Sequence, residues 1–183
     1  IVSIIGPKLT IEVSATPIEG ITNDHKITVK LSEVVAEGMI KEEIQINPGL
    51  GQVQTNEDII TEALKKRTEL KELYEKAGTN INPLLLIQIP RKKATDIRSP
   101  EEKIIEILEK EGVTTSNKKL GLWLAEKDKK INLDYLEKDD SQVDVLVFKE
   151  AIAQGWDCPR ASILLLQREW NSENYVFNIQ TLG

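Results

Sequence analysis

Two apolar runs near the end of the chain constrain its fold more than any other feature. The first, at 143–148, is rich in β-branched residues, and the second occupies 162–166. Each predicts a buried strand. The residues between them predict a short helix, which Gly155 ends because a residue without a Cβ adopts the left-handed conformation most easily, and which Pro159 prevents from resuming. A strand, a short helix and a turn before the next strand form a crossover unit, whose loops lie at the edge of a parallel sheet where ligands bind.

The same alternation extends back through the middle of the chain. An uninterrupted apolar run at 84–89 predicts a central parallel strand that is covered on both faces. A capped helix is predicted at 99–112, where Ser, Pro and Glu stand at the start and Gly at the end, and a further strand is predicted at 120–125. Strands that alternate with helices from Leu84 onward predict an α/β fold with a mainly parallel sheet and helices on both faces.

The first part of the chain has shorter and weaker patterns. Apolar and polar residues alternate at 8–13, which predicts a strand. Two further alternating segments, 26–31 and 40–46, predict a β-hairpin whose turn contains Glu37 and Gly38. We expect this hairpin to be an insertion within a linker.

A long amphipathic helix is predicted to begin after Thr55 or Asn56. The Thr55 hydroxyl and the Asp58 carboxylate stand at capping-box spacing, so each can satisfy a free backbone donor. Apolar residues then recur at three- and four-residue spacing, and Gly78 is suited to end the helix. The charged residues of this helix are expected to form a solvated face.

The composition excludes several classes of function. The apolar fraction of 40% is ordinary for a globular protein, and no apolar run approaches the roughly 18 residues that suggest a membrane span. A single cysteine and a single histidine exclude an internal disulfide, leave too few ligands for zinc hydrolysis, and fit a cytoplasmic protein. Because His25 is distant in sequence, Cys158 is expected to be a small, buried, inert thiol rather than a nucleophile.

The net charge of −6 neither favours nor excludes nucleic-acid binding, because such binding depends on a local basic strip rather than on the total charge. Basic residues do gather on the predicted loop at 91–98, which leaves the carboxyl end of a strand, where phosphate contacts are expected. A solvated loop is the alternative. Asp139, Asp140 and Asp144 are expected to lie in a solvated turn, and a site for a hard cation is the alternative there.

The sequence of the turn between the last two predicted strands resembles that of a known protein family. Lys149-Glu150, Gly155, Asp157 and Pro159 stand in the order of motif V of superfamily-two helicases and translocases, which these residues resemble. The longer sequence around this turn reads Phe148-Lys149-Glu150-Ala151-Ile152, followed by Gly155-Trp156-Asp157-Cys158-Pro159-Arg160-Ala161. It most resembles the restriction (Res) subunit of type III restriction enzymes.

Further segments resemble other motifs of that family, in the family's order. Ser14-Ala15-Thr16, at a predicted strand end, resembles motif III, and the strand at 84–89 stands where the family has motif IV. Ile179-Gln180-Thr181-Leu182-Gly183 resembles the opening of motif VI, which in the family continues to two arginines. Because position 1 is not Met and the chain stops within this motif, we expect it to be an excised fragment.

The resemblance implies a domain organisation. Residues 1–20 would supply the last strand of a first RecA-like domain, with motif III. Residues 21–56 would be the linker with its hairpin. Residues 57–183 would be the second RecA-like helicase domain, truncated within motif VI.

The resemblance also implies a function, that of the ATP-dependent DNA translocase or helicase of a Res subunit. Such a subunit couples ATP hydrolysis to DNA movement and cleavage together with a Mod methyltransferase. ATP and Mg would be cofactors of the full-length enzyme, and its partners would be double-stranded DNA, Mod and the first RecA-like domain, with no membrane. The chain contains no Gly-x-x-x-x-Gly-Lys-Ser/Thr phosphate loop and no Walker B segment, so alone it is expected to bind no cofactor and to be inactive.

Two other interpretations remain open. The first is another superfamily-two DNA motor, such as a type I restriction subunit or a repair helicase. The second is a non-catalytic nucleic-acid-binding or interaction module that keeps the fold without the motor activity.

The family roles can be carried to individual residues of this chain. Lys149 stands where many helicases have a Thr that contacts phosphate, so its role is transferred with a change of chemistry. Plain turn or surface roles for Ser14, Thr16, Asp157 and Lys149 are the alternatives. The residues implied for coupling through motif III are Ser14, Ala15 and Thr16; for the nucleotide and the interdomain contact Gly155, Asp157, Gln180 and Gly183; and for DNA Arg91, Lys92, Lys93, Arg98 and Lys149.

Charge reversal of Lys92 and Lys93 in the full-length enzyme is expected to weaken DNA binding and to lower its salt dependence, because each lost phosphate contact removes about 0.9 from the slope of log K against log salt. Equilibrium titrations with duplex DNA at several salt concentrations measure this slope. An unchanged slope would exclude the loop from the DNA path.

Overall fold

The computed structural model describes residues 27–39, 45, 55–90, 97–124, 130–149 and 156–167. The chain divides into two compact units, Ile1–Ile44 and Gln45–Gly183. In the first unit, the described residues contain one short helix, α2 (Leu31–Ala36). The second unit contains the sheet and the remaining helices.

The predicted hairpin is wrong at its first strand. Residues 27–30 belong to no strand, and α2 begins at Leu31. The backbone N–H of Lys30 donates to the Glu33 carboxylate at 3.2 Å, and Gly38, with a φ of 67°, follows the helix instead of turning a hairpin. A side chain that caps a helix start thus outweighed a short alternating pattern. The strands predicted at 8–13 and 40–46 lie outside the described residues, apart from Gln45.

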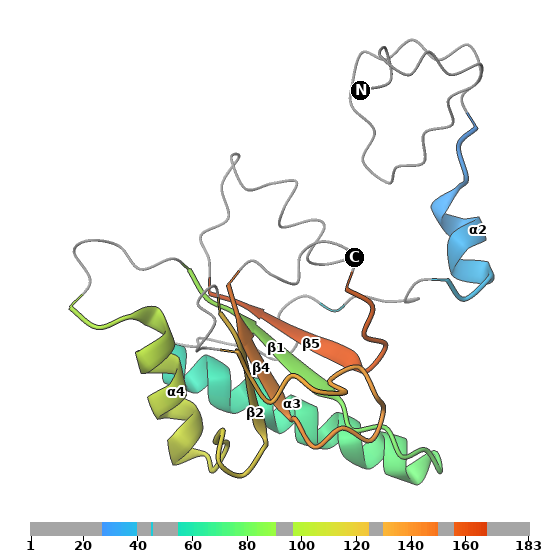
Figure 1. The fold of residues 1–183 in the computed structure, drawn as a ribbon. Coiled ribbons are helices and arrows are strands. Elements are labelled where there is room, and N and C mark those ends of the chain that lie inside the picture. Colours follow the sequence, from blue (N-terminus) through green and yellow to red (C-terminus); the bar gives the residue numbers. More distant parts are fainter. Residues whose placement is uncertain are drawn as a thin grey trace, which may run out of the picture. The chain divides into compact units, whose positions relative to one another are not determined.

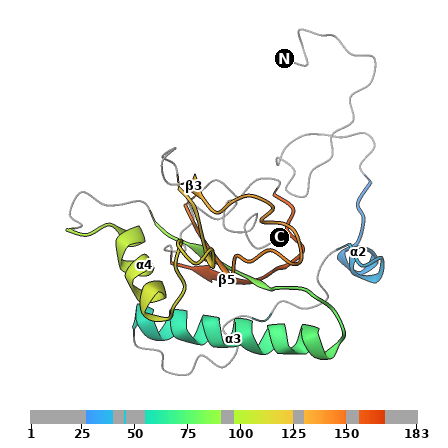
Figure 2. The same cartoon turned by 60° about the horizontal axis from the view of Figure 1, so that its bottom comes forward.

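The second unit is built on a five-stranded sheet in the order β3-β2-β4-β1-β5, of which Figure 1 labels β1, β2, β4 and β5 and Figure 2 labels β3. All neighbouring strands are parallel except β3, which pairs with β2 in the antiparallel direction. The α/β class and the mainly parallel sheet are therefore confirmed. The strands are β1 (Leu84–Gln88), β2 (Leu120–Trp123), β3 (Lys130–Ile131), β4 (Val145–Phe148) and β5 (Ala161–Leu166).

The two long helices follow their predicted capping signals. Helix α3 (Asn56–Lys76) begins with the Thr55–Asp58 capping box and is followed by Gly78 at a φ of 75°. Helix α4 (Pro100–Lys110) begins with Ser99 and Glu102 in the same arrangement. Both lie on one face of the sheet (Figure 2), where apolar residues of both helices pack against alternate residues of β1, β2 and β4.

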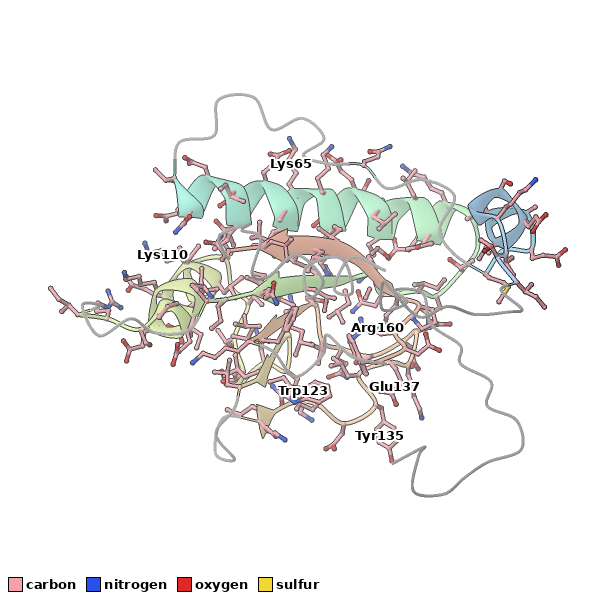
Figure 3. The ribbon with its side chains drawn as sticks, turned by 90° about the horizontal axis from the view of Figure 1, so that it is seen from above. Lys65, Lys110, Trp123, Tyr135, Glu137 and Arg160 are labelled. Atoms are coloured by element: carbon pink, nitrogen blue, oxygen red, sulfur yellow. The ribbon has the colours of Figure 1, made fainter. Side chains whose placement is uncertain are left out.

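The opposite face of the sheet has no helix among the described residues. Its apolar cluster is completed by Leu133 and Leu136 from one loop and by Trp156 and Cys158 from another. Figure 3 shows Trp123 and the Tyr135–Glu137 turn on this side, away from α3. The prediction of helices on both faces is therefore seen on one face only in the described part of the chain.

The two strands around the motif V-like turn differ in burial, although both were predicted to be buried. Every residue of β4 is buried, whereas every residue of β5 is half-buried. The difference follows from position, because β4 lies between β2 and β1, while β5 pairs only with β1 among the described strands. An interior position covers a strand on both sides, which its sequence alone does not show.

A buried polar network closes the amino edge of the sheet. Arg67, on the buried side of α3, donates from Nε to the backbone carbonyls of Pro83 at 2.8 Å and Asp144 at 3.1 Å, and its guanidinium pairs with the Asp144 carboxylate. Asn82 donates to the same carboxylate at 3.0 Å. Asp144 is thus not part of a solvated turn, as had been predicted, because its side chain is only 15% exposed and is held by a buried cation.

Arg160 ties the same edge together from the start of β5. It is 1% exposed, and it donates to the carbonyls of Leu136 at 2.7 Å, Asn82 at 2.7 Å and Val143 at 3.0 Å. Burial lowers the pKa of both buried guanidinium groups, an effect that the Asp144 carboxylate opposes. Because arginine remains charged at neutral pH even so, these groups need the carbonyl and carboxylate partners that surround them.

Asp144→Ala is expected to lower the free energy of unfolding by about 3–5 kcal/mol, because it leaves the buried Arg67 without its carboxylate. Urea denaturation of the wild-type and variant chains measures the difference. Asp140→Ala, which removes an exposed carboxylate from the same loop, is the control and should change little. Equal stability of the two variants would show that the ion pair contributes nothing to the fold.

Candidate functional site

The strand connections define a candidate site at the carboxyl edge of the sheet. The connection after β1 passes through α4 on one face, whereas the described end of the connection from β4 to β5 packs Trp156 and Cys158 against the opposite face. β1 and β4 are neighbours in the sheet. In α/β sheets, ligands bind outside the carboxyl ends of adjacent strands whose connections leave on opposite faces.

Gln88 is the last residue of β1 and lies at this point. It is fully buried, and its side-chain amide donates to the backbone carbonyl of Lys149 at 3.3 Å. Its Oε1 has no hydrogen-bond partner in the described part of the chain. Sequence reasoning missed Gln88, although a single amide at the end of an otherwise apolar run was a signal that could have identified it.

Lys149 follows β4 and faces the first turn of α4. Its Nζ lies 3.4 Å from Oε2 and 3.5 Å from Oε1 of Glu101. The two side chains are 19% and 9% exposed, so Lys149 is not the exposed surface lysine that had been one alternative. Its role as a DNA contact remains a prediction. Glu101 was not predicted, because nothing in the sequence links it to a residue that follows a distant strand.

Asp157 is exposed, and its neighbours in the segment are not. Trp156 is half-buried and Cys158 is buried, so the extended chain directs alternate side chains toward and away from the sheet. Trp156 contacts Trp123, the last residue of β2, edge to face, with ring centroids 6.2 Å apart. Asp157 therefore follows a residue anchored near the carboxyl end of β2 and projects away from the core.

Cys158 is a free buried thiol, as predicted. Burial raises its pKa, and the nearby positive charge of Arg160 opposes that change without reversing it. A raised pKa lowers the thiolate fraction at neutral pH, which is unfavourable for nucleophilic chemistry. Cys158 therefore contributes packing to this face of the sheet.

Arg98, from the predicted basic loop, already has an ionic partner. Its guanidinium lies 2.6 Å from the Glu106 carboxylate, and both side chains are about half exposed, at 53% and 49%. This contact raises the pKa of Arg98 and lowers that of Glu106. Because both side chains are exposed to water, Arg98 can exchange Glu106 for another anionic partner at little cost in free energy.

The other predicted site residues lie outside the described part of the chain. The structure therefore brings together Lys149, Gln88 and Glu101 at the carboxyl edge and places Asp157 in the segment that leads into β5. The predicted residues for which it gives no position are Ser14, Ala15, Thr16, Arg91, Lys92, Lys93, Gly155, Gln180 and Gly183.

No protein-family model, curated protein or solved structure matches this chain. Within the described residues, no group of His, Cys, Asp or Glu side chains could hold a metal ion. None of the helices in these segments combines the length and the apolar character that crossing a membrane requires.

Cys158 is expected to react with iodoacetamide at pH 8 at least about tenfold more slowly in the folded chain than in the urea-unfolded chain, because it is buried and its pKa is raised. Mass spectrometry of timed, quenched samples gives both rates. Equal rates would show that the thiol is open to solvent.

Proposed function

We propose that Gln45–Gly183 contains the second RecA-like domain of an ATP-dependent DNA motor, similar to the Res subunit of type III restriction enzymes. The observation that carries this proposal is the position of the motif V-like segment. It connects two parallel strands, β4 and β5, that flank β1. Lys149 begins the segment at the carboxyl edge, and Asp157 is exposed near its middle.

Exposure of Asp157 supports a role outside its own domain. A carboxylate that touches a nucleotide between two RecA-like domains must project from the surface of each isolated domain. Asp157 does so, while Trp156 and Cys158 anchor the backbone on either side. In this proposal the first RecA-like domain holds ATP and Mg, and Asp157, with Gly155, Gln180 and Gly183, completes the cleft.

The proposal assigns DNA to the carboxyl edge of the sheet. Lys149 and Arg98 would contact backbone phosphates there, together with Arg91, Lys92 and Lys93. Motif III, with Ser14, Ala15 and Thr16, would couple this surface to the nucleotide. Double-stranded DNA and a Mod methyltransferase are the partners in this proposal.

One observation favours a second candidate, a non-catalytic interaction module. Lys149 and Arg98, the two proposed DNA contacts that are described, are both engaged with carboxylates of α4. A domain that had lost its motor activity would retain such pairs as structural contacts. DNA-stimulated ATP turnover separates the two candidates, because only a motor shows it.

In the full-length enzyme, Asp157→Ala is expected to reduce DNA-stimulated ATP turnover about tenfold or more, because it removes a group that positions the nucleotide. Folding should be unchanged, since the side chain is exposed. Steady-state turnover with saturating DNA, together with a thermal melt, tests both statements. Asp140→Ala, another exposed carboxylate, is the matched control. Turnover equal to that of the control would identify Asp157 as a plain turn residue.

A further inference from the structure

At the carboxyl edge, the backbone and the side chain of Lys149 contact different elements. Its carbonyl accepts a hydrogen bond from the buried Gln88 amide at 3.3 Å, and the preceding residue, Phe148, pairs with Gln88 in the sheet. The ammonium group, in contrast, contacts the first turn of another element, α4, through Glu101. Lys149 can therefore change its ionic partner without any change in the sheet.

The contact with Glu101 is suited to exchange. The Nζ lies 3.4 Å and 3.5 Å from the two carboxylate oxygens, which is longer than the roughly 2.7–2.9 Å of a strong charge-assisted hydrogen bond. Glu101 also has a second source of stabilisation, since the first turn of a helix favours negative charge. Because Glu101 is only 7% exposed, release of Lys149 leaves a poorly solvated carboxylate that this interaction stabilises in part, and the phosphate contact has to offset the remaining cost.

We propose that Glu101 and Lys149 form an electrostatic latch, in which Glu101 occupies Lys149 until a nucleic-acid phosphate displaces it. This inference rests on the proposed function, because it deepens the DNA contact assigned to Lys149. A phosphate diester carries the same charge as the carboxylate and can take its place at the ammonium group. Binding of DNA then breaks the link between the end of β4 and the start of α4.

The latch has two consequences. It lowers the affinity for DNA, because each binding event must first break the pair with Glu101. It also couples DNA binding to α4, since the start of this helix loses a contact whenever Lys149 binds a phosphate. Glu101 is accordingly a positioning residue, whereas Lys149 is the contact.

The test is a double-mutant cycle on this chain with a fluorescein-labelled DNA duplex, read by anisotropy at several salt concentrations. Glu101→Gln keeps the shape of the side chain and frees Lys149, so we expect the Kd to fall about three- to tenfold. Lys149→Met should raise the Kd and lower the salt slope by about 0.9. In the double variant, the gain from Glu101→Gln should vanish.

Glu109→Gln is the matched control, because it removes the same charge from an exposed position near the other end of α4. The latch is overturned when Glu101→Gln gains no more than this control, or when its gain persists with Lys149→Met. If Glu101→Gln does not fold in a thermal melt, Glu101→Asp carries the test, since it retracts the carboxylate while keeping its charge and should show a smaller gain. A wild-type chain that binds no duplex, or one that shows salt-dependent binding without a Glu101 effect, overturns the latch alone, whereas the DNA-motor proposal is tested separately by DNA-stimulated ATP turnover of the full-length enzyme.

Discussion

The parallel pairing of β1 with β4 on one side and β5 on the other is the constraint on which the second unit depends. β1 is buried along its whole length, and its four apolar residues alternate between the packing of one face and that of the other. Its pairing also aligns the ends of three strands that come from distant parts of the sequence. The buried polar residues of the unit lie at the two edges of the sheet, the amino edge and the carboxyl edge, and these edges differ in chemistry.

Buried charged side chains close the amino edge of the sheet. Arg67 and Arg160 are buried among backbone carbonyls from the starts of the strands, and Arg67 also pairs with the Asp144 carboxylate. Removal of any one partner would leave a charge in a poorly solvated place. The carboxyl edge differs, because Lys149 is 19% exposed and its contact with the buried Glu101 is long, at 3.4 Å. A rigid amino edge, together with the exchange proposed for the Lys149–Glu101 pair, would suit a domain that binds a changing partner.

The motif V-like segment joins these two edges. It starts with Lys149 at the carboxyl edge and ends with Arg160 at the amino edge, and from Trp156 to Arg160 its side chains alternate between the sheet and the solvent. The inward residues are Trp156, Cys158 and Arg160, which explains why the sequence of this segment includes residue types suited to packing. Asp157 is left outward by the same alternation, so one short segment serves both the fold and the proposed nucleotide contact.

The sequence by itself determined the elements with local signals: the capping boxes of α3 and α4, the glycine after α3, the buried strands β1 and β4, and the inert Cys158. The strand predicted from the sequence at 26–31 was wrong, because a cap between Lys30 and Glu33 outweighed the alternating pattern and α2 formed instead. Only the tertiary structure decided the polar contacts at the two edges. Arg67 and Asp144 are 77 residues apart in sequence, and Lys149 and Glu101 are 48 apart. Helix and strand signals act between near neighbours, whereas the partner of a buried charge depends on which distant strand ends the sheet brings together.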